Sequence, residues 1–345
     1  GKNMTAPYSF EVGIYRPPSE GGASSLLLRF TRNCPWNKCT FCGMYKHETF
    51  SKRSVEEIKG DMDTIKRLCQ DLQDISTQLG YQRTINREVI FKIIEQNPQL
   101  DASPEFAMVV NWLLSGAKTA FLQDGNSLIM ATPHLMEALQ HLRATFPSIE
   151  RVTTYARSKT LSRKPLEELT RIRKAGLDRL HVGMESGDDD LLKQVKKGVT
   201  GKEHIIGGKK AIQAGFQLSE YWMPGLGGKD MWENHARNTA GVLSQINPHY
   251  IRSRPFFPRP GSPIFKSYEQ DALSLLTPLE QLYELRLMVE GLDVTSRLCF
   301  DHAGNYWTDK EGRLLFSHSY EGYQMPHEKG RVLETIDRGI QGYGG

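Results

Sequence analysis

The sequence has few cysteines and no secretory signal. Five cysteines occur in 345 residues, an odd number that cannot all pair within one chain. The N-terminal residues GKNMTAPYSF also lack the apolar core of a signal peptide. Because structural disulfides persist mainly in oxidising compartments, we expect free thiols and a cytoplasmic location. Cys69 and Cys299 stand apart from the other three and are interpreted as buried small hydrophobic residues.

A long apolar run and a strong charge imbalance are also missing. No apolar run approaches the roughly 20 residues that a membrane-spanning helix needs. Lysine and arginine number 44 and aspartate and glutamate 40, so the formal net charge is only +4. A nucleic-acid footprint normally brings a clear basic excess. The sequence therefore predicts no membrane span and does not indicate a nucleic-acid partner, although a local basic groove is compatible with it.

Three cysteines are crowded into the stretch RNCPWNKCTFCGMY at residues 32–45, namely Cys34, Cys39 and Cys42. Thiolates bind soft metal ions, and a [4Fe-4S] cluster normally takes four cysteine ligands. A loop with three cysteines can therefore leave one iron open to another ligand. A structural zinc site that takes His47 as its fourth ligand is the alternative.

The rest of the chain alternates short apolar runs with helical patterns, which is typical of a parallel α/β sheet. We expect six strands, at residues 25–31, 119–123, 151–155, 179–184, 217–223 and 250–254. Helical patterns cover residues 55–79, 86–96, 103–115, 191–197, 278–291 and 329–340. Polar residues that directly follow parallel strands are the ones that reach a ligand.

The cysteine loop resembles the loop that holds a [4Fe-4S] cluster in the radical S-adenosylmethionine (SAM) enzymes. Its first gap has four residues where the family commonly has three, while Phe41 stands just before the last cysteine, where the family carries an aromatic residue near the adenine of SAM. Later stretches, from about residue 26 to residue 265, resemble the branch containing the oxygen-independent coproporphyrinogen oxidases and the elongator-type radical SAM proteins. The resemblance implies an incomplete (β/α)6 barrel of the TIM type.

The resemblance also implies a domain organisation. An N-terminal loop segment (1–24) precedes the partial barrel (25–265). The first crossover of the barrel carries a helical insertion (43–117), and a C-terminal helical cap (266–345) follows.

The ends of the second and third strands carry residues that the resemblance assigns to SAM. Asp124 and Asn126 follow the second strand, where the family receives the amino group of SAM. Arg157 follows the third strand and could pair with a carboxylate through two parallel hydrogen bonds. Plainer interpretations are a helix-capping turn for the first two residues and a surface arginine for the third.

The ends of the fourth and fifth strands match the family more specifically. Glu185 directly follows an apolar strand in VGMESG, which is a poor position for a surface charge, and it stands with Ser186 where the family contacts the ribose or amino group of SAM. The turn WMPGLGG resembles the glycine-rich turn that flanks adenine. This resemblance assigns Met223, Gly225 and Gly227 to the binding of SAM.

Two arginines near the sixth strand indicate an acidic substrate. Arg252 and Arg254 are two residues apart and share one strand face. An unpaired buried cation costs several kcal/mol, so an anionic ligand is one way to compensate them. An internal ion pair with Glu220 or another inward carboxylate is the alternative. His302, in the tail, titrates near neutral pH and joins Arg254 as a catalytic candidate.

The resemblance implies that SAM binds the open iron and is cleaved reductively to a 5′-deoxyadenosyl radical, which abstracts hydrogen from the substrate. We expect two cofactors, a [4Fe-4S] cluster held by the three crowded cysteines and SAM. The expected partners are a small-molecule substrate with a carboxylate or phosphate and an electron donor such as flavodoxin or ferredoxin. The alternatives are a radical SAM methyltransferase or RNA-modifying enzyme, and a non-catalytic iron–sulfur or zinc-binding protein.

Overall fold

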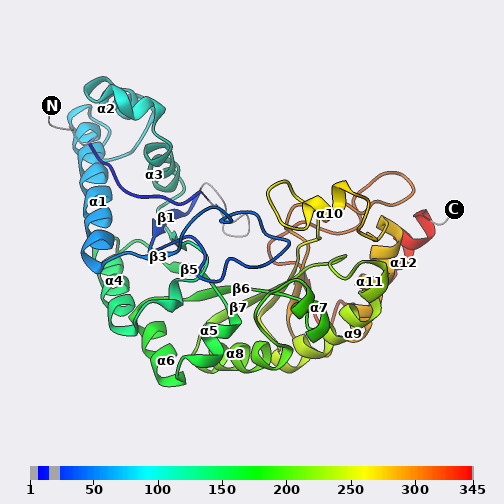
Figure 1. Ribbon diagram of the computed structural model, residues 1–345. Coiled ribbons are helices and arrows are strands. Elements are labelled where there is room, and N and C mark those ends of the chain that lie inside the picture. Colours follow the sequence, from blue (N-terminus) through cyan, green and yellow to red (C-terminus); the bar gives the residue numbers. More distant parts are fainter. Residues whose placement is uncertain (1–6, 15–23, 344–345) are drawn as a thin grey trace. The chain divides into compact units, whose positions relative to one another are not determined.

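The computed structural model describes residues 7–14 and 24–343 (Figure 1). Their contacts divide them into two compact units. The first unit contains the described residues up to Asn33, together with residues 50–154 and 171–178. The second unit contains the cysteine loop (34–49), residues 155–170 and the chain from Arg179 onward. Most of the N-terminal loop segment predicted for residues 1–24 lies outside the described residues.

Parallel strands form the sheet of the first unit. Strand β1 (Leu26–Arg29) pairs with β4 (Thr119–Gln123), and β4 pairs with β5 (Arg151–Ala156), whose last two residues belong to the second unit. The apolar side chains of β1 and β4 are buried, as expected for a strand covered on both faces. A short antiparallel ribbon joins β2 (Thr31–Arg32) and β3 (Ser51–Lys52).

Helices fill the long connection between β1 and β4, where the sequence predicts a helical insertion. Helix α1 (Val55–Gln78) begins with a capping box between Ser54 and Glu57, and its buried residues recur at helical spacing. It packs against α4 (Thr132–Thr145). The other helices of this unit are α2 (Arg87–Gln96), η3 (Pro98–Ala102), α3 (Pro104–Leu114) and η4 (Ser127–Ile129).

The sheet of the second unit is parallel except at one edge. Its order is β6 (Arg179–Glu185), β7 (Gln217–Trp222), β8 (Tyr250–Ser253) and β9 (Arg297–Cys299), followed by the antiparallel β10 (Tyr323–Gln324). Strands β9 and β10 come from the tail, for which the sequence predicts only a helical cap. Both are too short to show an alternating pattern, which is why the periodicity missed them.

Helices α8 (Gly201–Gln213), α9 (Gly228–Ile246), α11 (Pro278–Glu290) and α12 (Lys329–Tyr343) pack in succession, each against the next (Figure 1). The remaining helices are α5 (Ser158–Arg163), α6 (Leu166–Ala175), which continues into the first unit, α7 (Asp189–Gln194) and α10 (Phe265–Glu269).

Helix α7 ends three residues before the end that the sequence predicts, residue 197. Asp188 caps its start by accepting from the Leu191 amide at 2.9 Å. Beyond Gln194, Lys196 and Gly198 have φ values of 56° and 74°, so the chain turns sharply where the helical pattern continues.

The predicted α/β class and the six parallel strands are confirmed, with strand ends shifted by one or two residues. In neither unit do the described strands close into a ring, which agrees with a partial barrel. Among the described residues, no helix is long and apolar enough to cross a membrane. Cys299 is buried and Cys69 half-buried, and burial raises the pKa of both thiols to about 12.

Gly187, two residues after the end of β6, lies close to the backbone of α9. A Cβ at this position would lie 2.4 Å from the carbonyl oxygen of Asn238. Because the obstacle is backbone, we expect Gly187→Ala to lower the free energy of unfolding by about 1–3 kcal/mol. Gly241 lies in α9, as Asn238 does, but the space around it is open. Gly241→Ala should therefore leave the free energy of unfolding unchanged or raise it by up to about 1 kcal/mol. Urea denaturation of the metal-free variants measures both, and equal effects would contradict the packing argument.

Candidate functional site

The three crowded cysteines lie on one loop of the second unit, and all three are free and partly exposed. The Cys42 amide donates to the Cys39 carbonyl oxygen at 3.4 Å, and the Asn37 amide donates to the Cys34 sulfur at 3.4 Å. Hydrogen bonds to cysteine sulfurs help to set the potential of iron–sulfur clusters. In the described part of the chain, no group of three or more His, Cys, Asp or Glu side chains is placed to hold a metal ion.

The four residues between Cys34 and Cys39 form a turn that is held by hydrogen bonds between Asn37 and the later residues Tyr45 and Lys46. Asn37 has a φ of 50°, in the left-handed region that asparagine tolerates. Its side-chain amide donates to the Tyr45 carbonyl oxygen, and Lys46 Nζ donates to the Asn37 carbonyl oxygen at 2.8 Å. The longer gap is therefore an ordered turn.

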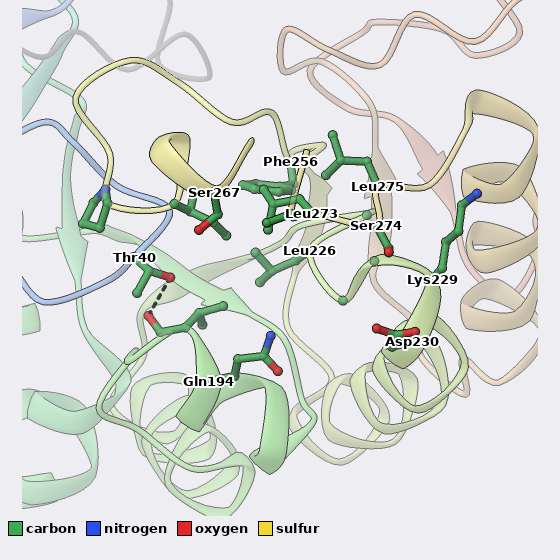
Figure 2. A pocket seen from close by; sticks show the side chains of 17 residues that line it. Thr40, Gln194, Leu226, Lys229, Asp230, Phe256, Ser267, Leu273, Ser274 and Leu275 are labelled. Carbon is green, nitrogen blue, oxygen red and sulfur yellow. Dashed lines mark hydrogen bonds between the residues drawn. The ribbon is translucent and has the colours of Figure 1, made fainter. Parts of the chain in front are cut away.

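The cysteine loop is fastened to the turn that follows α7, residues 195–198, which we call the loop seat. The Thr40 amide donates to the Val195 carbonyl oxygen at 3.0 Å, and the Thr40 hydroxyl reaches the same oxygen (Figure 2). Trp36 Nε1 donates to the Lys196 carbonyl oxygen at 2.7 Å. Two consecutive carbonyl groups of the loop seat thus hold the cysteine loop.

Arg157 also reaches the loop seat. Its Nη2 donates to the Lys197 carbonyl oxygen at 2.7 Å, and its guanidinium lies 5.2 Å from the centre of the Trp36 ring. Burial lowers the pKa of Arg157, and the neighbouring Cys34 and Cys39 act in the opposite direction. The structure therefore places this predicted cofactor residue beside the cysteines.

Glu185 ends β6 with a side chain that is only 3% exposed. Its Oε1 lies 3.5 Å from both Lys197 Nζ and Arg254 Nη2, and its Oε2 has no hydrogen-bond partner among the described residues. A Cβ at Gly183 would lie 2.4 Å from Oε1, so glycine there leaves room for the carboxylate. A buried carboxylate oxygen without a donor is an available acceptor for a ligand.

Lys197 connects Glu185 with the cysteine loop, and the sequence reasoning missed it. Its Nζ lies 5.7 Å from the centre of the Phe41 ring. Burial raises the pKa of the Cys39 thiol, while the charges of Lys197 and Arg157 oppose that rise. A lysine near the end of an expected helix usually interacts with the last carbonyl groups, so nothing in the pattern singled it out.

An apolar cluster and a cavity lie next to the cysteine loop. Phe41 and Met223 are buried in this cluster, and Cys39 and Cys42 pack against it. The cavity has a volume of about 350 Å³, within the usual range for small-molecule sites. Figure 2 shows several of its lining residues, among them Thr40, Leu226, Phe256 and Leu275.

The glycine turn after β7 borders the same cavity. Gly225 has a φ of 85° and donates its amide to Glu284 Oε1 at 2.7 Å. Burial raises the pKa of Glu284 to about 8, so this carboxyl group is mostly protonated at neutral pH. Gly227 directly precedes α9, and a Cβ at Gly228 would lie 2.6 Å from the Ser274 carbonyl oxygen. Sequence reasoning missed Glu284, because it lies inside a predicted helix of the tail.

Ser186, which directly follows β6, is linked through His235 of α9 to Met223, which directly follows β7. Its hydroxyl lies 2.7 Å from His235 Nδ1 and accepts from the Asp188 amide at 3.0 Å. Burial lowers the pKa of His235 to about 4, so the ring is neutral. Its Nε2 donates to the Met223 carbonyl oxygen at 2.8 Å, which leaves Nδ1 to accept from Ser186. A contact between Ser186 and SAM stays a prediction.

Asp124 and Asn126 lie in the first unit. Asp124 Oδ2 accepts from Arg29 Nη2 and from the Asn33 amide, both at 2.7 Å. Its Oδ1 has no hydrogen-bond partner among the described residues, and a Cβ at Gly13 would lie 2.2 Å from it. Asn126 is buried and precedes η4 without a side-chain capping bond, so the capping interpretation is wrong for this residue.

Both arginines of the predicted substrate site have carboxylate partners. Arg252 is fully buried, and its Nη1 lies 3.0 Å from Asp301 Oδ1. Arg254 pairs with Glu185. The alternative, an internal ion pair with Glu220 or another inward carboxylate, is therefore confirmed for carboxylates other than Glu220. The sequence argument for an acidic substrate assumed that these two arginines lack anionic partners. Since both have a carboxylate partner in the protein, that argument no longer holds.

Two more titratable groups lie near these pairs. Burial lowers the pKa of His302, whose Nδ1 lies 2.9 Å from the Ala303 carbonyl oxygen, and the charge of Arg254 lowers it further. Glu220 is fully buried without a hydrogen-bond partner in the described chain, and burial raises its pKa well above the usual value. Burial therefore favours the uncharged form of both groups.

No protein-family model and no curated protein matches the sequence. Solved structures do match. The chain is similar to the radical S-adenosylmethionine methyltransferase TsrM from Kitasatospora setae, with a TM-score of 0.50 and 14% identity over 78% of this chain and 42% of TsrM. It is also similar to methylornithine synthase (PylB), with a TM-score of 0.49 and 17% identity over 89% of this chain and 73% of that one. Coproporphyrinogen III oxidase (HemN) from Escherichia coli gives a TM-score of 0.45 and 14% identity over 77% and 51%.

The similarity to TsrM shows a shared fold. The chain spans less than half of the length of TsrM and about half of HemN.

The position of Lys197 predicts a change in thiol reactivity. Since its positive charge favours the Cys39 thiolate, we expect Lys197→Met to raise the pKa of that thiol further and to slow its alkylation at pH 8 by about two- to tenfold. Lys193→Met, which removes an exposed lysine of α7, is the matched control and should leave the rate unchanged. Mass spectrometry of the Cys39 peptide in metal-free protein measures the rate, and equal rates in both variants would contradict the placement of Lys197.

Proposed function

We propose that this chain, whose fold is that of the radical SAM enzymes, cleaves SAM reductively at a [4Fe-4S] cluster held by Cys34, Cys39 and Cys42. The observation that carries the proposal is the arrangement around the loop seat. There, the loop that carries the three cysteines lies beside two cations and a buried carboxylate with an available oxygen, which come from separate parts of the second unit.

The donor set suits such a cluster. Three thiolates supply three of the four ligands of a cube and leave one iron for another ligand. Each thiolate of a cube binds a different iron, so the three sulfurs need not converge on one point, as they must for a single zinc ion. Arg157 and Lys197 lie close enough to offset part of the thiolate charge.

A cluster held by Cys34, Cys39 and Cys42 would supply one electron for the reductive cleavage of SAM to methionine and a 5′-deoxyadenosyl radical, which would take hydrogen from the substrate. The protein binds and shields the reactants. Glu185 Oε2 would accept from the amino group or ribose of SAM, and Arg157 or Lys197 would pair with its carboxylate. The apolar cluster around Phe41 and Met223 would contact the nucleoside and exclude water.

We infer that the substrate is a small molecule bound on the side of Glu185 where Arg254 and His302 lie. The ion pairs described above give no preference for an acidic substrate. An external one-electron donor of the flavodoxin or ferredoxin type and a cytoplasmic location complete the proposal. A radical SAM methyltransferase or RNA-modifying enzyme would use the same site, and a non-catalytic iron–sulfur protein would not cleave SAM.

Metal analysis tests the cluster. Anaerobically reconstituted protein should contain about four irons per chain, as one cube requires. Each of Cys34→Ala, Cys39→Ala and Cys42→Ala should abolish stable assembly, while Cys69→Ala should retain it. Stoichiometric zinc without iron binding would exclude the proposal, and full iron with no 5′-deoxyadenosine after reduction would leave a non-catalytic iron–sulfur protein.

A substitution of Glu185 tests SAM binding separately from assembly of the cluster. Because Glu185→Gln replaces a charged acceptor, we expect a loss of roughly 1.5–3 kcal/mol, or about ten- to a hundredfold in SAM affinity, with unchanged iron content. Glu233→Gln, on the exposed surface of α9, should bind SAM like the wild type. Equilibrium binding to the reconstituted protein gives the comparison, and unchanged affinity in Glu185→Gln would remove this residue from the site.

A further inference from the structure

We propose that a basic face beside the cysteine loop, made of Trp36, Lys38, Lys193 and Lys196, docks an acidic one-electron carrier protein. The proposal rests on the function proposed above and adds the surface through which the electron donor binds. It starts from a local concentration of charge on a chain that is almost neutral overall.

The charge is concentrated in two segments. Residues 34–47 contain two lysines and no aspartate or glutamate, and residues 191–202 contain four lysines and no aspartate or glutamate. Acidic residues bound both segments, Glu48 after the first and Asp190 and Glu203 on either side of the second, so the positive charge is confined to these two short stretches of a chain whose net charge is only +4.

Trp36 brings the two segments together. Its Nε1 donates to the Lys196 carbonyl oxygen, and Lys38 Nζ lies 4.7 Å from the centre of its ring. On the other segment, the Lys196 amide donates to the Lys193 carbonyl oxygen at 3.1 Å. Lys38 therefore lies over the partly exposed Trp36 ring, and the indole is bonded to the backbone of the turn that carries Lys196 and follows Lys193.

The lysines of this face have no anionic partner in the described chain. Lys38, Lys193 and Lys196 are exposed, and none of them forms an ion pair with another described residue. Exposed like charges repel one another and attract a surface of opposite sign, which accelerates association at low ionic strength. Aromatic residues such as Trp36 are enriched at protein–protein interfaces.

The position of the face favours an electron carrier over a nucleic acid. Trp36 and Lys38 lie between Cys34 and Cys39 in the sequence, so a protein bound here comes within a few residues of the thiols. Electron transfer requires this proximity, whereas nucleic-acid binding does not. In the transfer, the reduced carrier loses one electron and the enzyme gains one, with no bond made or broken on either protein.

The test compares two reductants on the holoenzyme. In the double variant Lys38→Glu/Lys196→Glu, we expect kcat/KM for 5′-deoxyadenosine formation with a reduced acidic flavodoxin to fall by about tenfold or more at low salt. The rate with dithionite, which needs no docking surface, should stay within about twofold of wild type. The control Lys209→Glu/Lys310→Glu reverses two exposed lysines outside the basic face and should match the wild type with both reductants.

Direct binding gives a second readout that does not depend on SAM cleavage. Oxidised flavodoxin should bind the wild-type protein and the control, more weakly as salt rises, and should bind Lys38→Glu/Lys196→Glu at least about tenfold more weakly. Unchanged flavodoxin binding and turnover in that variant would overturn the proposal. An equal loss with both reductants, or binding of a short RNA in preference to flavodoxin, would overturn it as well. A wild-type protein that binds flavodoxin but does not cleave SAM with dithionite would instead contradict the function proposed above.

Discussion

The contact between the cysteine loop and the loop seat is the constraint on which the site depends. Three consecutive carbonyl groups, those of residues 195–197, accept from Thr40, Trp36 and Arg157. Each such bond contributes about 0.5–1.5 kcal/mol, so the set can offset part of the entropy lost when the loop is ordered. The carbonyl groups are available because α7 ends at Gln194 instead of using them in another helical turn.

The same turn gives neighbouring lysines opposite surroundings. The side chain of Lys197 lies over Phe41 and reaches Glu185, whereas that of Lys196 is exposed. The positive φ of Lys196 reverses the chain between them. Gly198 completes the turn, since a Cβ there would lie 2.4 Å from the Trp36 ring. One short turn thus binds the cysteine loop, places the positive charge of Lys197 beside Glu185 and exposes Lys196 on the surface.

The sequence predicts the parts of this site that have a local pattern. Three close cysteines, strands of apolar residues and a glutamate directly after a strand can all be recognised without a structure. Lys197 and His235 cannot, because each acts on residues far away in the sequence and occupies an ordinary helical or turn position. Arg252 shows the same limit for energetics, since the compensating charge of Asp301 comes from the tail, 49 residues later. Local patterns indicate which groups carry chemistry, and tertiary contacts decide which of them are already paired.

The longer gap between the first two cysteines is explained by contacts of its own residues. Trp36 bonds to the loop seat, Asn37 makes the left-handed turn and bonds to Tyr45, and Lys38 lies over the Trp36 ring. A gap one residue shorter would have to give up one of these contacts. The departure from the commoner spacing is therefore coupled to Gly198 and to the early end of α7, because the indole needs both the space and the carbonyl group that they provide.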